Sequence, residues 1–196
     1  VSKPDVTAPG VQILAGNTPL PDEATGGLPG QLFQAIAGTS MSSPHVAGAG
    51  ALLKALHPDW TPGQIKSALM TTAKTKKVYK ENGRTRADAF DDGSGRIDLN
   101  LAGNPGLTFD ETGDDYVAQK DALWNANYPS FYHPSLPGSI TVQRKAKDVT
   151  GKQSTWTLAS DTDHTDWNIV IPDHITVPTN GEVAFDITIN AANVHL

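Results

Sequence analysis

The 196-residue sequence predicts an α/β fold in its first part, followed by a small all-β sandwich. Two segments with helical features follow one another between residues 40 and 73. Beyond residue 138, four short stretches rich in alternating apolar residues are separated by turn residues, as in a small antiparallel sandwich. We therefore expect two domains, residues 1–104 and residues 105–196, with the boundary in the stretch between residues 103 and 115.

The N-terminal segment is predicted to be extended. Residues 1–16 are typical of a short strand, a turn at Pro9-Gly10 and a second short strand. Residues 17–30 contain three prolines and three glycines, which indicate a surface loop. A brief extended segment, residues 31–37, then leads the chain to Ser40.

The first helix is expected to run from about Ser40 to Leu56 and to end before Pro58. Gly48 and Gly50 lie in its interior, where each costs about 1 kcal/mol relative to alanine. A helix tolerates this cost when its backbone must lie close to another element. We expect that element to be a buried sheet.

Residues 61–64, Thr-Pro-Gly-Gln, predict the start of a second helix. They form a capping-box pattern with proline at the first helical position. Its apolar face is predicted to carry Ile65, Ala68, Leu69 and Thr72. His57 is expected to end the first helix, where its imidazole can meet the last carbonyls.

The sandwich strands are predicted at residues 138–143, 154–158, 167–171 and 182–189. Turn residues separate them at intervals suited to an antiparallel sheet. Three tryptophans of this region are interpreted as core residues in preference to a sugar-binding platform: Trp124, Trp156 and Trp167.

The most informative segment is residues 38–48, Gly-Thr-Ser-Met-Ser-Ser-Pro-His-Val-Ala-Gly. It places Ser40 on a glycine-preceded turn where a long helix of small residues begins. Unpaired backbone N–H groups and the positive end of the helix dipole favour developing negative charge there. Serine is also a common helix N-cap, but the pattern favours an acyl-transfer nucleophile.

Residues 38–48 resemble the catalytic-serine segment of the subtilisin-like serine peptidases, or subtilases. Residues 3–11, 57–62 and 65–73 are similar to the segments that flank this serine, and their sequences most resemble the plant-like, cucumisin-type branch. Residues 95–98 and 104–110 resemble the exit from its catalytic domain, and residues 127–130 the entry to a fibronectin type III-like sandwich. The resemblance implies the C-terminal part of a parallel-sheet catalytic domain followed by such a sandwich, both incomplete.

This resemblance implies hydrolysis of peptide bonds through an acyl-enzyme on Ser40. The backbone N–H of Ser40 would supply one oxyanion donor, and Gly38 and Thr39 would shape the approach to the serine. Ile36 would line the leaving-group side of the cleft. Protein or peptide substrates follow from this activity, and the resemblance implies a secreted enzyme.

Two parts of the catalytic triad are missing from the sequence. Subtilases carry the aspartate first, the histidine second and the serine last, and neither the aspartate segment nor a His-Gly-Thr-His segment occurs here. We expect both to lie upstream of Val1, so the chain alone should be inactive and its partner should be the N-terminal part of the same peptidase. Unpaired sheet edges also predict self-association of the fragment.

His45 is not expected to be the base. It lies five residues beyond Ser40, about 500° further around the helix axis, which turns it to a different face. The family resemblance gives this histidine a structural role. Four histidines of the second half are isolated in sequence and are predicted to lie on the surface: His133, His164, His174 and His195.

Composition excludes several classes of function. The net charge of −6 argues against a nucleic-acid binder, and no apolar stretch approaches the roughly 20 residues of a membrane span. The sequence contains no cysteine, which excludes disulfides and cysteine–zinc sites.

Acidic turns at residues 91–95, 113–115 and 161–166 are interpreted as solvated. The last of them lacks the pattern of an EF-hand, and neither a metal nor a cofactor is expected. A short basic run is interpreted as solvated too: Lys74, Lys76, Lys77 and Lys80.

Two alternatives remain open at this point. The sandwich half could be a binding or structural module that docks a substrate protein or the peptidase itself. The parent protein could also be a pseudopeptidase in which the aspartate or histidine is replaced.

Overall fold

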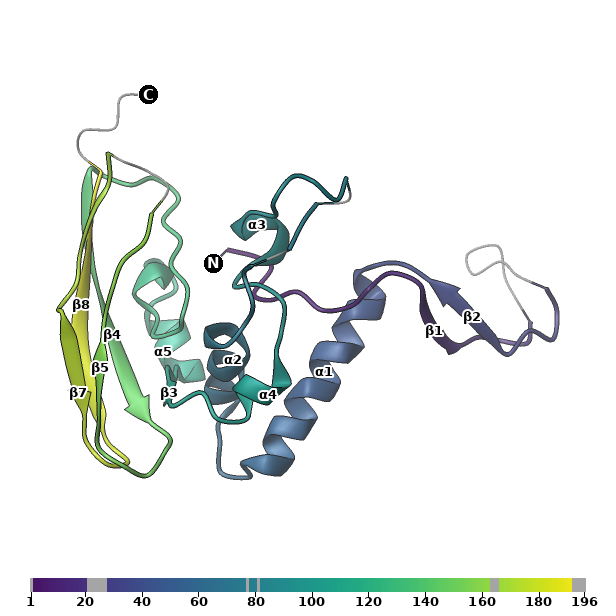
Figure 1. Ribbon diagram of the computed structural model, residues 1–196, viewed down its shortest axis with the longest axis horizontal. Helices are drawn as coiled ribbons and strands as arrows, with labels where there is room; N and C mark the ends of the chain where they lie inside the picture. Colours follow the sequence, from purple (N-terminus) through teal and green to yellow (C-terminus); the bar gives the residue numbers. More distant parts are fainter. Residues whose placement is uncertain (1, 21–27, 77, 81, 163–165, 192–196) are drawn as a thin grey trace.

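The computed structural model describes residues 2–20, 28–76, 78–80, 82–162 and 166–191 (Figure 1). The first part contains β1 (Ile13–Gly16), β2 (Phe33–Ile36), α1 (Thr39–Leu56), α2 (Pro62–Thr71), α3 (Ala89–Asp92) and α4 (Leu99–Ala102). The second part contains β3 (Leu107–Thr108), α5 (Gly113–Ala118), the 3-10 helix η1 (Leu123–Asn125), β4 (Ser139–Asp148), β5 (Ser154–Thr157), β6 (Asn168–Val170), β7 (His174–Val177) and β8 (Glu182–Asn190). The predicted combination of helices and sheets is confirmed.

The arrangement in Figure 1 places the helices between two groups of strands. The long strands of the second part gather at one side, α2 and α4 lie in the middle, and α1 lies beyond them. The β1–β2 hairpin projects away at the opposite end. Among the described helices, none combines the length and the apolar character needed to cross a bilayer.

Helix α1 begins one residue before the predicted start and ends at the predicted Leu56. Only Ala49 and Leu53 of this helix are buried. A Cβ added to Gly48 would meet nothing within 4 Å, and one added to Gly50 would meet the Ile65 side chain at 3.9 Å. The predicted packing of these glycines against a sheet is therefore wrong for the described residues.

Helix α2 is fixed at its start by the predicted capping box. The Thr61 side chain accepts the Gln64 N–H at 3.0 Å, and the Gln64 side chain accepts the Thr61 N–H at 3.2 Å. The helix then buries residues on most of its circumference, including Ala68, Leu69 and Met70. Each large apolar side chain buried in this way contributes about 1.5–3 kcal/mol. The first core therefore forms between α1, α2 and α4: Ala49, Leu53, Trp60, Ala68, Leu69 and Ala102.

Strands β1 and β2 pair with each other as an antiparallel hairpin, with Ile13 opposite Ile36 and Gly16 opposite Phe33. The parallel sheet expected for this part is not found in the described residues. Their one parallel pairing is an isolated bridge between Thr7 and Arg96. β1 and β2 pair with each other along one edge, and no further strand of the described residues pairs with their other edges.

The second part contains two antiparallel sheets, one of four strands in the order β3-β4-β8-β6 and one of two strands, β5-β7. All four predicted strands are present, and β4 and β8 are paired along most of their length. Inward side chains alternate with exposed ones on β4, and its Ala146 packs against Ile175 and Val177 of β7. The two sheets thus enclose a second core between them.

The two parts are joined through α2. Its Gln64 side chain donates to the Thr108 hydroxyl at 3.3 Å, and its Ser67 hydroxyl accepts the Phe109 N–H at 2.8 Å. Val149, in the turn after β4, packs against the first core. These contacts hold the four-stranded sheet directly against the helix that follows α1.

Two aromatic predictions have mixed outcomes. The His57 ring does not bond the last carbonyls of α1: its Nε2 lies 2.8 Å from the Gly103 carbonyl, and the ring stacks on Trp60 at 3.8 Å. Trp156 packs against the second core as predicted. Trp124 and Trp167 are only half-buried, with Trp124 lying against the His133 ring at 4.4 Å.

Candidate functional site

Ser40 is the second residue of α1, directly after the turn formed by Gly38. Gly38 has φ 157° and ψ 167°, a backbone conformation that essentially only glycine occupies. The chain can therefore turn sharply into the helix and leave the Ser40 side chain exposed in the first turn. The local geometry predicted for this serine is thus present.

The N-terminus of α1 is not closed by a side chain. Gly38 is the N-cap and provides no side-chain acceptor, and the first turn contains no acidic residue. The first backbone N–H groups of a helix have no acceptor within the helix. Together with the helix dipole, they make this end of α1 favourable for negative charge next to Ser40.

The neighbouring serine shows a different environment. The Ser42 hydroxyl donates to the Thr39 carbonyl at 3.0 Å and is thereby held against the helix. No hydrogen bond to another described residue holds the Ser40 hydroxyl. The Ser40 hydroxyl, unlike that of Ser42, is therefore free to react.

A cavity of about 370 Å³ opens beside Ser40, between α1 and β1. Its lining consists of Ile13, Leu14, Ala15, Ser40, Met41, Pro44 and His45. Sequence reasoning missed the contribution of β1, because only the folding of the hairpin brings it next to the serine. Ile36 is not part of the lining; it lies opposite Ile13 in the hairpin.

His45 lies at this cavity too, so the expectation that it faces elsewhere is wrong in part. Its Nδ1 lies 2.8 Å from the Met41 carbonyl. Because a carbonyl can only accept, Nδ1 carries the proton in this bond. No hydrogen bond joins His45 to Ser40 in the described residues, so the two do not form a nucleophile–base pair.

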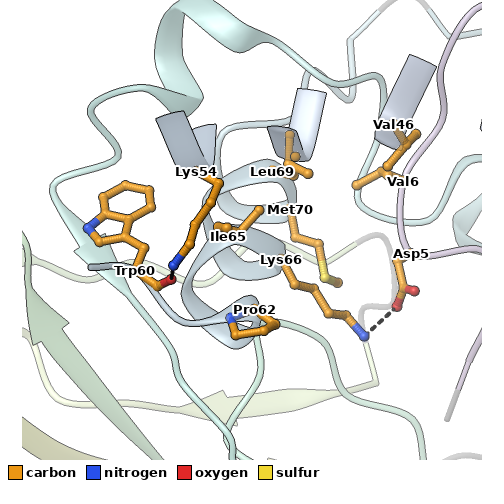
Figure 2. Close-up of a pocket in the computed structure, with 11 residues that line it drawn as sticks. Asp5, Val6, Val46, Lys54, Trp60, Pro62, Ile65, Lys66, Leu69 and Met70 are labelled. Atoms are coloured by element: carbon orange, nitrogen blue, oxygen red, sulfur yellow. Dashed lines mark hydrogen bonds and ion pairs between the residues drawn. The ribbon is translucent and has the colours of Figure 1, made fainter. Parts of the chain in front are cut away.

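A larger cavity, about 490 Å³, lies between residues 5–6, α1 and α2 (Figure 2). Both lysines that line it are engaged: Lys54 Nζ donates to the Trp60 carbonyl at 2.8 Å, and Lys66 Nζ lies 3.0 Å from Asp5 Oδ1. Burial opposes ionisation of Asp5, but Lys3 and Lys66 outweigh it and lower the pKa of this carboxyl. The lining contains neither serine nor histidine, so this cavity supplies neither a serine nucleophile nor a histidine base.

The acidic turn at residues 91–95 is less solvated than predicted, because its Asp92 is buried. Asp88 and Asp91 form a capping box at α3, and Lys80 lies 3.2 Å from Asp88 and 2.9 Å from Asp91. Lys74 pairs with Asp98. The basic run is thus partly engaged in ion pairs, with Lys77 outside the described residues.

The remaining acidic segments do not form a metal site in the part of the chain that the structure describes. Residues 113–115 begin α5, where the Thr112 side chain accepts the Asp115 N–H. Residues 163–165 of the turn at 161–166 lie outside the described residues, as do His164 and His195. Within the described ranges, no three histidine, aspartate or glutamate side chains are grouped so as to hold a metal ion.

Arg144 is a buried residue that sequence reasoning missed. It is 4% exposed on the inner face of β4, and burial lowers its pKa. Its guanidinium donates to the carbonyls of Tyr128, Trp124 and Ser130 at 3.0–3.2 Å. The signal was its place in the inward alternation with positions 142 and 146. Arg144 fastens residues 124–130 to the sheet.

Comparison with known proteins gives a consistent result. Residues 1–98 match the model of the Subtilase family. The chain is 40% identical over 185 residues to the subtilisin-like protease SBT5.4 of Arabidopsis thaliana, covering 76% of this chain and 23% of that protein. It is 34% identical over 218 residues to SBT3.9 of the same plant, covering 96% of this chain and 27% of that protein. The chain thus spans about a quarter of the length of these relatives.

A solved structure similar to this chain is fervidolysin from Fervidobacterium pennivorans, described as a keratinolytic enzyme related to subtilisin. The sequence identity is 21% and the TM-score 0.37, and the match covers 92% of this chain and 23% of that one. A similarity of this size supports no statement beyond the match itself.

Proposed function

This chain belongs to the subtilase family, and from that premise we propose that it carries the nucleophile of a serine endopeptidase, Ser40. The proposal depends on the exposure and the hydrogen bonding of the Ser40 side chain. Ser40 is exposed in the first turn of α1, follows a glycine turn, and has a hydroxyl that no described residue holds. A serine that serves only as a helix cap would engage its oxygen with the helix backbone.

In the proposed reaction, Ser40 Oγ attacks the carbonyl carbon of a peptide bond while a histidine base takes its proton. The negative charge that develops on the carbonyl oxygen is stabilised by the backbone N–H of Ser40. A single donor of this kind contributes about 3–4 kcal/mol to transition-state stabilisation. The open N-terminus of α1 supports this role.

Neighbouring residues are assigned by the same proposal. Gly38 and Thr39 shape the approach to Ser40 through the turn before α1. Ile36 is assigned to the leaving-group side of the cleft from the family alone; it lies opposite Ile13, which lines the cavity at Ser40, but does not line that cavity itself.

The base and its orienting aspartate are proposed to come from polypeptide outside this chain. The support is that no His-Gly-Thr-His segment occurs in the sequence, and that His45 Nδ1 is engaged with the Met41 carbonyl. A serine hydroxyl without a base is a weak nucleophile at neutral pH. The chain alone is therefore expected to be inactive.

The finer assignments belong to this proposal as well. Residues 1–104 are assigned to the catalytic domain and residues 105–196 to a fibronectin type III-like sandwich. The two facing antiparallel sheets around Ala146, Ile175 and Val177 support the second assignment. Secretion and protein or peptide substrates are proposed from the family alone.

The test is proteolysis by the full-length translation product that carries this segment. Ser40→Ala is expected to reduce casein hydrolysis to background, because the acyl-enzyme cannot form. The matched control is Ser42→Ala, which removes a hydroxyl two residues away and should retain most of the activity. Unchanged hydrolysis by the Ser40→Ala protein would refute the proposal.

A further inference from the structure

We infer that Gly10 is a positioning residue for Ser40: its backbone contacts the turn at Gly38 and fixes the position of that turn, which precedes the serine. This inference rests on the proposed function, because it assigns Gly10 a role in that reaction. Gly10 precedes β1, and Gly38 precedes α1, so the hairpin between them returns the chain to the same place. Gly10 itself touches neither substrate nor the reacting atoms.

The two glycines meet through their backbones. The Gly38 N–H donates to the Gly10 carbonyl at 2.8 Å. A Cβ placed on Gly10 would lie 2.9 Å from the Gly38 carbonyl oxygen and 3.2 Å from Ser42 Cβ. The first of these distances is shorter than real Cβ contacts, so any side chain at position 10 must displace the turn.

The atom that a side chain at position 10 would displace is the Gly38 carbonyl oxygen, which takes part in the first turn of α1. The Gly38 carbonyl accepts the Met41 N–H at 3.0 Å and so closes the first turn of α1 around Ser40. No side chain caps this end of the helix, so the backbone contacts of Gly38 help to fix the direction of its first turn. Moving the Gly38 carbonyl therefore moves the Ser40 N–H and hydroxyl together.

A displacement of this kind affects chemistry more than binding. A misplacement of about 1 Å in reacting groups can lower a rate by about 100-fold. We expect substrate contacts outside the turn to be little altered by a methyl group at position 10. We therefore expect a fall in kcat with little change in KM.

Gly16 provides the matched control. It ends β1 in the same hairpin, and a Cβ added there would meet nothing within 4 Å. Gly10→Ala and Gly16→Ala thus remove the same backbone freedom from one segment, but only the first places an atom against the turn before Ser40.

The first measurement uses this chain and needs no activity. In amide NMR spectra, Gly10→Ala should shift the Gly38, Ser40 and Met41 signals and speed hydrogen exchange at Gly38, while α2 amides keep their protection. Gly16→Ala should leave these signals in place. In the unmodified chain, a scalar coupling across the Gly38 N–H to Gly10 carbonyl bond should be detectable, and its absence would overturn the inference. So would loss of α2 protection in Gly10→Ala, since Gly10 would then support the fold as a whole.

The second measurement uses the full-length peptidase. Gly10→Ala should lower kcat by about 10- to 100-fold and leave KM within about twofold, while Gly16→Ala changes neither by more than about twofold. A raised KM with unchanged kcat would overturn the positioning role. If Ser40→Ala retained activity, the proposed function would fail, and the NMR comparison would still decide whether Gly10 braces the turn.

Discussion

Single polar side chains close several of the turns in this chain, and Asp148 is the clearest case. Its carboxylate, 2% exposed, accepts backbone N–H groups of Thr150, Gly151 and Asn180 and the Thr150 hydroxyl at 2.7–3.1 Å. One carboxylate thereby joins the turn after β4 to the turn before β8. Burial opposes ionisation of Asp148, but these hydrogen bonds outweigh it and lower its pKa to about 2.

This geometry predicts an acid-dependent loss of stability. Because the folded-state pKa lies below the ordinary value of 3.8, the contribution of Asp148 is complete above about pH 4 and falls as the pH drops toward about 2. Asp148→Asn should lower the free energy of unfolding at pH 6 by about 1–3 kcal/mol, since an NH2 group replaces one carboxylate oxygen and the groups that donate to that oxygen lose their acceptor. The difference between the two proteins should shrink below pH 4. Urea unfolding followed by circular dichroism at pH 6, 4, 3 and 2.5 measures this.

The exposed Asp161 provides the control, and Asp161→Asn should leave the unfolding curves nearly unchanged. A stability difference between wild type and Asp148→Asn that stayed constant from pH 6 to pH 2.5 would contradict the assignment.

At the scale of elements, α2 connects the helical part to the sheets. Its N-cap Thr61 not only accepts the Gln64 N–H but also donates its hydroxyl to Asp110 Oδ1 at 2.7 Å. A Cβ on Gly63 would overlap the same carboxylate oxygen, so the first turn of α2 lies directly against residues 110–111. The residues that begin α2 are thus also the residues that join the helical part to the sheets.

Removing this cap should destabilise the whole chain. Thr61→Ala should cost about 1 kcal/mol for the cap and about 1 kcal/mol for the bond to Asp110. Thr112→Ala is the matched control: Thr112 caps α5 with the same capping box, but α5 has no buried residue, so its loss should fray one short helix. Urea midpoints and amide exchange separate the two outcomes, and equal destabilisation by both variants would argue against α2 as the junction.

The elements that the sequence could predict are those with strong local signals. The capping box at Thr61, the stop before Pro58 and the alternation along residues 139–148 specify α2, the end of α1 and β4 without tertiary information. Helices α3, α4 and α5 have four to six residues each, too few to show a helical period. Strand β3 has only two residues and exists through its pairing with β4.

Part of the candidate site could be predicted from the sequence, and part could not. The position of Ser40 follows from its local segment, because the Gly38 turn and the helix start are adjacent in sequence. The cavity beside it does not, because Ile13 and Leu14 reach Ser40 only through the folding of the hairpin. The error about the parallel sheet has the same origin: strand partners are set by tertiary pairing, and β1 pairs with β2.

At the scale of the whole molecule, the β1–β2 hairpin projects away from the helices (Figure 1) and carries exposed apolar side chains. Leu14 is 70% exposed, Phe33 60% and Leu32 56%. An isolated two-stranded hairpin is at best marginally stable in water. Apolar side chains on such an arm favour contact with a further protein surface.

The chain alone should therefore self-associate as its concentration rises. The double variant Leu14→Ser and Phe33→Ser should shift the apparent mass toward the 20.7 kDa monomer. Val117→Ser removes an apolar side chain of similar exposure, 71%, from α5 and should have little effect. Light scattering coupled to size-exclusion chromatography measures this, and a uniform monomer of the unmodified chain at every concentration would contradict it.

The central claim is that Ser40 is a nucleophile whose activating groups lie on other polypeptide, and covalent labelling tests it most directly. A fluorophosphonate probe is applied to the full-length protein and to this chain, and the labelled residue is identified by mass spectrometry. The account predicts one label per full-length molecule, located on Ser40, and no label on the chain alone. A label on another serine of the full-length protein, or equally fast labelling of the chain alone, would contradict it.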